Sequence, residues 1–140
     1  MKAKSFHCSK SGVVQPLAAS IGTNLHCVCD KMPPAYPCDK DKVVYIGIEM
    51  DGKVPHPVEQ FVKDLDKART TAVAFYIVNG NGNTAGLEGL EKMLASKDIV
   101  KAGETLSIIC KSSFFKKGQV TDADVAKVLE WSQEIAAMKF

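Results

Sequence analysis

The residues best suited to bind a ligand form a short polar run near the N-terminus. The run combines two serines, a lysine and a glycine, in the order Ser9, Lys10, Ser11, Gly12, Val13 and Val14. It lies between an expected strand and an expected helix. The first amides of a helix have no partner within the helix, its dipole favours an anion, and serine hydroxyls add further donors. The run is therefore expected to hold a phosphate-like anion, although a serine-rich turn that only caps the helix would have the same composition.

Two further polar loops follow expected strands. The first combines two acidic residues with a glycine, in the order Glu49, Met50, Asp51 and Gly52. The second alternates asparagine and glycine, in the order Asn79, Gly80, Asn81, Gly82 and Asn83. Asparagine amides donate and accept hydrogen bonds, and glycine lets a backbone approach a ligand closely. The same residues also make good turns and flexible connections, so neither loop requires a ligand.

Apolar patterning predicts the elements that must position these loops. Runs rich in β-branched and apolar residues predict strands at residues 3–8, 25–29, 43–48, 71–78 and 105–110. Apolar residues at helical spacing predict helices that begin between residues 13 and 15, at Pro57, near Leu87 and after a capping box at Thr121. Prolines at positions 33, 34 and 37 exclude a helix between the second and third strands.

Strands that alternate with helices over 140 residues predict one α/β domain. Its sheet is expected to be parallel and covered by helices on both faces. In such a fold the ligand site is expected in the crevice at the carboxyl ends of the strands. That edge is where the three polar loops belong, because each follows an expected strand.

The chain resembles the flavodoxins in these features. Their mark is a hydroxyl-rich loop after the first strand, Thr/Ser-x-Thr/Ser-Gly-x-Thr, which holds the phosphate of flavin mononucleotide (FMN). This sequence matches the loop at Ser9, Ser11 and Gly12 and departs from it at Val14, where the last hydroxyl is missing. A third strand that ends in Gly47, residues 57–61 and residues 115–121 also look flavodoxin-like. The resemblance extends over most of the chain and implies a three-layer α/β/α sandwich whose five parallel strands follow the order 2-1-3-4-5.

The same resemblance implies a function. Residues 9–14 would hold the phosphate of FMN, while residues 49–52 and 79–83 would flank its ring system. The flavoprotein would carry single electrons to or from a redox partner protein, either a reductase or an acceptor. No side chain is expected to act as an acid, a base or a nucleophile, so an electron carrier is favoured over a dedicated enzyme.

Three departures from the flavodoxin pattern support an alternative. Flavodoxins usually press an aromatic ring against the flavin, yet residues 49–56 and 79–86 contain no aromatic side chain. The helix between the second and third strands is missing. The net charge is +2, whereas flavodoxins are usually acidic. The alternative is a flavodoxin-like module that has lost FMN and binds a partner or another anion.

Composition and charge exclude several classes of function. A net charge of +2 with Arg69 as the only arginine argues against nucleic acid as a partner. No apolar run approaches the roughly 18 residues that a membrane span needs. No apolar signal-peptide core follows the basic N-terminus. A cytoplasmic protein that does not bind membranes is therefore expected.

The five cysteines are odd in number and several lie inside apolar runs, so in a reducing compartment they are expected to be free thiols packed as small hydrophobic groups. Cys27, Cys29 and Cys38 could supply soft metal ligands. However, a Cys-x-Cys pair on a strand lacks the turn of a metal-binding knuckle, so no metal is expected. Cys8 precedes the polar run as the nucleophile does in low-molecular-weight tyrosine phosphatases. Those enzymes need an arginine where this chain has Val14, so that activity is excluded.

Overall fold

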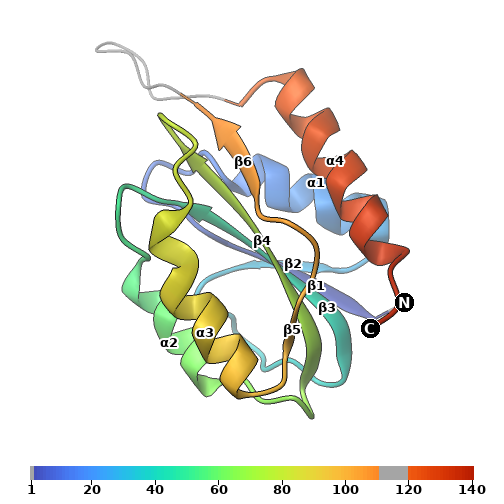
Figure 1. Cartoon of the computed structure of the whole chain (residues 1–140). Coiled ribbons are helices and arrows are strands. Elements are labelled where there is room, and N and C mark those ends of the chain that lie inside the picture. Colours follow the sequence, from blue (N-terminus) through green and yellow to red (C-terminus); the bar gives the residue numbers. More distant parts are fainter. Residues whose placement is uncertain (1, 111–119) are drawn as a thin grey trace.

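The computed structural model describes residues 2–110 and 120–140, in which strands alternate with helices except after Val28–Lys31 and Val100–Lys101, where the next element is again a strand (Figure 1). The strands are β1 (Ala3–Cys8), β2 (Val28–Lys31), β3 (Asp41–Glu49), β4 (Thr70–Asn79), β5 (Val100–Lys101) and β6 (Leu106–Ile109). The helices are α1 (Gln15–Leu25), α2 (His56–Asp64), α3 (Glu88–Ser96) and α4 (Asp122–Ala136), with a 3₁₀ turn, η1 (Ala85–Leu87), before α3.

Six parallel strands within the described ranges form one sheet in the order β2-β1-β3-β4-β5, with β6 also paired to β4. The expected strand order is thereby confirmed. The central strands β3 and β4 lie side by side, with Ile46 opposite Phe75. Every residue at positions 43–48 and 72–78 is buried. A strand that is covered on both faces has no solvent side, which explains why these two segments are uninterrupted apolar runs.

Helices cover both faces of the sheet, α1 and α4 on one side and α2 and α3 on the other (Figure 1). On the first side the core includes Leu17, Ile21 and Val128. On the second side Val62 and Leu94 pack against strand residues. Each such side chain contributes roughly 1.5–3 kcal/mol when it leaves water. The observed fold is therefore the expected three-layer α/β/α sandwich.

The helices begin where the local sequence signals predict. Pro16 lies in the first turn of α1, where its missing amide costs no hydrogen bond. Before α4, the Thr121 hydroxyl accepts a hydrogen bond from the Asp124 amide at 3.2 Å, and the Asp124 carboxylate accepts one from the Thr121 amide at 2.9 Å. Of the flavodoxin-like segment at residues 115–121, residues 115–119 lie outside the described part of the chain. Among the described helices, none combines the length and apolar character that crossing a membrane requires.

The second strand begins later than predicted. The prediction of a strand at residues 25–29 was wrong at its N-terminal end, because α1 continues to Leu25. His26 then ends the helix in a left-handed conformation with φ 53°. Pairing starts at Val28, which lies opposite Lys4 of β1. The apolar stripe of the helix and the apolar start of the strand are contiguous in sequence, so patterning alone could not separate them.

The outer edge beyond β4 is occupied by two short strands instead of one. β6 confirms the strand expected at residues 105–110, whereas β5 was not predicted. β5 pairs with Ala72 and Val73, and β6 pairs with β4 from Tyr76 onward. Gly103 lies between them with φ 65°, a conformation that favours glycine. The edge is therefore interrupted in the middle.

The connection from β2 to β3 contains no helix, as its prolines predict. It is held at its start by Asp30, whose carboxylate accepts hydrogen bonds from the amides of Lys31 at 2.8 Å and Ala35 at 2.9 Å. Met32 and Cys38 pack into the core on the side of α2 and α3. We call residues 32–40 the proline loop. It covers the part of this sheet face that a helix would otherwise cover.

Candidate functional site

The three polar loops meet at the carboxyl edge of the sheet. β1, β3 and β4 are parallel neighbours, so the segments that follow them emerge side by side. They enclose a central crevice of about 320 Å³. Its lining comes from all three loops and from the end of β6: Ser11, Val13, Glu49, Met50, Asp51, Val78, Asn79, Gly80 and Cys110. This volume lies within the roughly 300–1,000 Å³ that is typical of small-molecule sites.

The carboxylate of Glu49 sits inside the first of these loops, residues 9–14, which we call the serine loop. Its Oε1 accepts a hydrogen bond from the Ser9 hydroxyl at 3.0 Å and from the Ser11 amide at 3.2 Å. The Ser11 hydroxyl also donates to Oε1. Three donors from the loop therefore converge on one oxygen of an anion.

The two serine hydroxyls connect this carboxylate to the start of α1. The Gly12 amide donates to the Ser9 hydroxyl oxygen at 2.9 Å, and the Val13 amide donates to the Ser11 hydroxyl oxygen at 3.3 Å. Gly12 adopts φ 82°, which turns the chain from the loop into the helix. The donors of the loop are thus directed at a carboxylate oxygen of the chain itself.

Glu49 and Val14 depart most from the sequence-based picture of the site. Glu49 was expected in a wall beside a flavin ring, whereas its carboxylate lies in the position expected for a phosphate. Val14 was expected to line the phosphate loop, but its side chain is fully buried in the core on the side of α1 and α4. Only its backbone is therefore available to a ligand in the loop.

The loop after β3 forms one wall of the crevice. Met50 is buried in the core, whereas Asp51 is exposed. Gly52 adopts φ 78° and its carbonyl lies close to Gly86 in η1, where an added Cβ would be 3.0 Å from that oxygen. The η1 turn thus supports this wall from behind.

The loop after β4, residues 79–83, forms the opposite wall and satisfies its own amides. The Asn79 side chain accepts a hydrogen bond from the Gly82 amide at 2.6 Å and donates to the Asn83 carbonyl at 3.0 Å. The side-chain oxygens of Asn81 and Asn83 likewise accept hydrogen bonds from the backbone amides of Asn83 and Ala85, respectively. The side-chain amides were expected to reach a flavin ring. In this structure they shape the loop instead.

A second hollow of about 830 Å³ lies beside the first and shares Glu49 and Asp51 with it. Three lysines, Lys10, Lys31 and Lys53, line it and outnumber its two acidic residues, so its rim has a small excess of basic side chains. We call it the lysine hollow. The sequence prediction included Lys10 but missed Lys31 and Lys53. Each of the three lies at or just after the end of a strand, so the parallel topology was the signal that could have placed them at one edge.

Titratable groups at this edge are perturbed mainly by burial. Burial lowers the pKa of His7 below its ordinary value, with the nearby Asp30 carboxylate opposing the shift. Burial and the nearby Glu49 carboxylate raise the pKa of the Cys8 thiol. Away from the edge, burial raises the pKa of both Cys27 and Cys38 to about 11. These thiols are protonated at neutral pH and are poor nucleophiles.

Metal ligands do not gather in the described part of the chain. No group of three or more histidine, cysteine, aspartate or glutamate side chains there is arranged to hold an ion. Cys27 and Cys29 are half-buried and Cys38 is buried.

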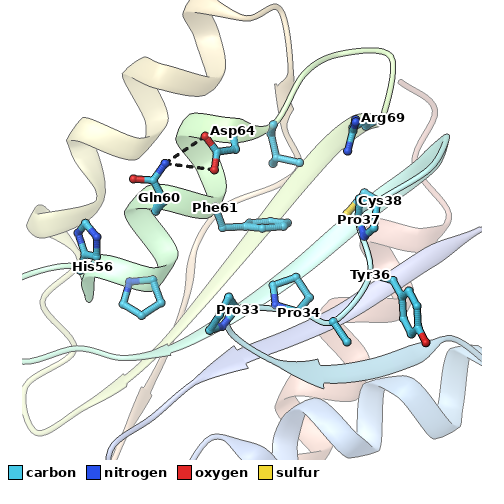
Figure 2. A pocket seen from close by; sticks show the side chains of 13 residues that line it. Pro33, Pro34, Tyr36, Pro37, Cys38, His56, Gln60, Phe61, Asp64 and Arg69 are labelled. Atoms are coloured by element: carbon cyan, nitrogen blue, oxygen red, sulfur yellow. Dashed lines mark hydrogen bonds between the residues drawn. The ribbon is translucent and has the colours of Figure 1, made fainter.

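An apolar groove of about 470 Å³ lies between the proline loop and α2 (Figure 2). Phe61 extends from α2 toward the loop that carries Pro33, Pro34 and Pro37 (Figure 2). The ring of Phe61 packs edge-on against Phe6, with 5.4 Å between ring centroids. We call this the proline groove. Its charged residues, Asp64 and Arg69, carry opposite signs, so no net charge selects a ligand there.

Sequence comparison and structure comparison give different results. No protein-family model matches the sequence, and no curated protein has a matching sequence. The structure is similar to oxidised flavodoxin 1 from Bacillus cereus, with a TM-score of 0.74 and 15% identity over 100% of both chains. A flavodoxin from the domain Archaea gives a TM-score of 0.74 at 16% identity, covering 97% of this chain and 96% of that chain. The Flv1 flavodiiron core from Synechocystis sp. PCC6803 gives 0.66 at 14% identity, covering 96% of this chain and 34% of that chain.

These likenesses establish a flavodoxin-like fold for the chain, since the similarity runs through all or nearly all of its length. At such low identity they do not carry over any ligand or activity. The function must be argued from the geometry of the site.

Proposed function

We propose that the chain binds FMN at the carboxyl edge of its sheet and serves as a small one-electron carrier. The observation that carries this proposal is the anion already seated in the serine loop. Hydroxyl and amide donors of Ser9 and Ser11 converge on the Glu49 carboxylate, which stands in for a phosphate group. A loop that is organised around charged oxygen fits the phosphate end of the cofactor.

The chain's own residues would hold and orient the cofactor. The serine loop would bind the phosphate, and the loops at residues 49–52 and 79–83 would enclose the ring system in the central crevice. FMN supplies the one-electron redox chemistry when it is bound, and the protein tunes it. The electron donor or acceptor would be a redox protein that docks at the same edge, where the basic rim of the lysine hollow would attract an acidic partner.

The second candidate is a flavodoxin-like module that binds an anion or a partner without flavin. It is favoured by the lack of aromatic side chains at residues 49–56 and 79–86. Each aromatic stack contributes about 0.5–1.5 kcal/mol beyond its buried area. Without two such stacks, FMN affinity is expected to be weaker by about tenfold or more.

The test is the absorbance spectrum of the purified protein, followed by titration of FMN with the chain while flavin fluorescence is recorded. Flavin absorption bands or saturable quenching support the carrier, and redox titration follows. In the Ser11→Ala variant, which loses a donor of the loop, FMN binding should weaken by about tenfold. Ser96→Ala removes a hydroxyl at the end of α3, away from the site, and should bind FMN as the wild type does.

A colourless protein that leaves FMN fluorescence unchanged would reject the carrier. The second candidate would then stand, and the lysine hollow would be the first surface to examine for an anionic ligand.

A further inference from the structure

We infer that Glu49 decides which ligands the serine loop accepts: its carboxylate occupies the anion position and must leave before a phosphate group can enter. The inference deepens the proposed function and rests on it only where a flavin is concerned. It assigns to one residue of this chain a selective role between ligands that carry a phosphate and ligands that do not.

The hydrogen bonds that hold Glu49 use the donors that a phosphate would need. The Ser9 hydroxyl, the Ser11 hydroxyl and the Ser11 amide all donate to the carboxylate. The amides of Gly12 and Val13 donate to the two hydroxyl oxygens behind them. A phosphate that enters the loop must take over these donors, so the carboxylate and the phosphate compete for one position.

The backbone of Glu49 is fixed, but its side chain borders a second space into which it can rotate. Glu49 is the last residue of β3 and lies opposite Val78 in β4. Next to it, Met50 is buried and its amide donates to the Val78 carbonyl at 3.1 Å. The side chain, in contrast, borders both the central crevice and the lysine hollow. Rotation would carry the carboxylate from the serine loop toward the basic rim of that hollow.

The negative charge of Glu49 disfavours ligands that carry a phosphate and leaves phosphate-free ligands unaffected. A phosphate group and a carboxylate in the same small loop repel each other, because like charges at short distance are unfavourable. A ligand without a phosphate places no second charge there, so it leaves Glu49 in position. Binding of a phosphate-bearing ligand therefore includes the cost of moving Glu49, whereas binding of a phosphate-free analogue does not.

The experiment compares three probes on the 140-residue chain. FMN and riboflavin are titrated by fluorescence, and inorganic phosphate is titrated by calorimetry and by the amide NMR signals of the serine loop. The Glu49→Gln variant keeps the shape of the side chain and removes its charge. It should bind FMN and phosphate at least about tenfold more tightly than the wild type and bind riboflavin about equally.

The matched control is Glu134→Gln, which removes the same charge from an exposed position on α4. It should bind all three probes as the wild type does, which separates the local effect from a change in net charge. Far-ultraviolet circular dichroism and thermal unfolding confirm that both variants are folded.

The outcomes separate this inference from the proposed function. If FMN and phosphate bind Glu49→Gln no better than the wild type, or if riboflavin gains as much as FMN, the inference is overturned even where FMN binds well. If no flavin binds either protein but phosphate binds Glu49→Gln more tightly, the inference holds and the flavin carrier is rejected. If phosphate and FMN both fail to bind Glu49→Gln, both are rejected.

Discussion

The serine loop and the proline loop leave neighbouring strands at the same edge of the sheet but are built in opposite ways. The serine loop is organised by hydrogen bonds around one carboxylate. The proline loop is anchored mainly by apolar burial, with Met32 and Cys38 in the core, and the Asp30 carboxylate holds only its start. Charged oxygen can be exchanged for other charged oxygen, whereas buried apolar side chains have no equivalent ligand to replace them. This difference indicates which loop is suited to bind a ligand. It is the loop whose internal contacts are of the same kind as those that a ligand would make.

The largest expected effect is a loss of stability on mutation of the proline groove. Phe61→Ala should lower the free energy of unfolding by about 2–3 kcal/mol, because it removes a half-buried ring and its contact with Phe6. Urea unfolding followed by circular dichroism measures the change. Ligand binding at the serine loop should not change. The control is Tyr36→Ala, whose side chain is 80% exposed and should cost less than about 0.5 kcal/mol.

If Phe61→Ala lowers the free energy of unfolding no more than Tyr36→Ala does, the proline groove is not held by packing. The contrast between the two loops would then be wrong.

The next effect belongs to the serine loop. Gly12→Ala should destabilise the fold by about 1–2 kcal/mol, because φ 82° is costly for a residue with a Cβ. No atom lies within 4 Å of the position of that Cβ, so the cost is conformational and not steric. Gly89→Ala in α3 is the matched control, because its Cβ would also meet open space. It should stabilise the fold by about 0.5–1 kcal/mol. Thermal and urea unfolding of both variants measure the difference, and a stable Gly12→Ala variant would contradict the strained turn.

The smallest effect concerns Asp30, whose carboxylate holds the start of the proline loop. Hydrogen bonds from the amides of Ala35 and Lys31 lower the pKa of Asp30 below its ordinary value of 3.8. Its stabilising contribution is therefore complete above the unfolded-state pKa and is lost as the pH falls through the lower folded-state pKa. Asp30→Ala should lower the free energy of unfolding by about 0.5–1.5 kcal/mol at neutral pH.

Urea titrations at neutral and acid pH test this prediction, and the gap between wild type and Asp30→Ala should narrow in acid. Asp39→Ala serves as the control, because the carboxylate of Asp39 makes only an exposed ion pair with Lys2 at 3.5 Å. An equal loss in both variants, or a gap that widens in acid, would show that Asp30 does not anchor the loop through its carboxylate.

The sequence could predict the sheet because its central strands carry a single, strong signal. The runs at residues 43–48 and 72–78 contain no polar or charged side chain apart from the tyrosine hydroxyls, and a strand covered on both faces leaves no other pattern. Pro16 and the Thr121 capping box placed two helix starts for equally local reasons. The start of β2 and the existence of β5 were missed because both are set by pairing with a neighbour and not by their own residues.

The meeting of the three polar loops at one edge of the sheet was predicted, whereas the contacts between them were not. That residues 9–14, 49–52 and 79–83 share one edge follows from strand direction alone. That Glu49 reaches the serine loop depends on the register of β1 and β3, in which Cys8 lies opposite Ile48. Because patterning does not give register, the meeting of the Ser9 and Ser11 donors with the Glu49 carboxylate became visible only in three dimensions.

The interruption between β5 and β6 also has a consequence for the protein at high concentration. An open sheet edge is a template on which another copy can add a strand, and this is a common route to aggregation. Here β4, ten residues long and almost wholly buried, lies inside the sheet, while the edge beside it is divided into strands of two and four residues. The opposite edge, β2, is also only four residues long. In the part of the chain that the structure describes, neither edge presents a long straight row of unpaired amides and carbonyls, which limits the template available to a strand from another copy.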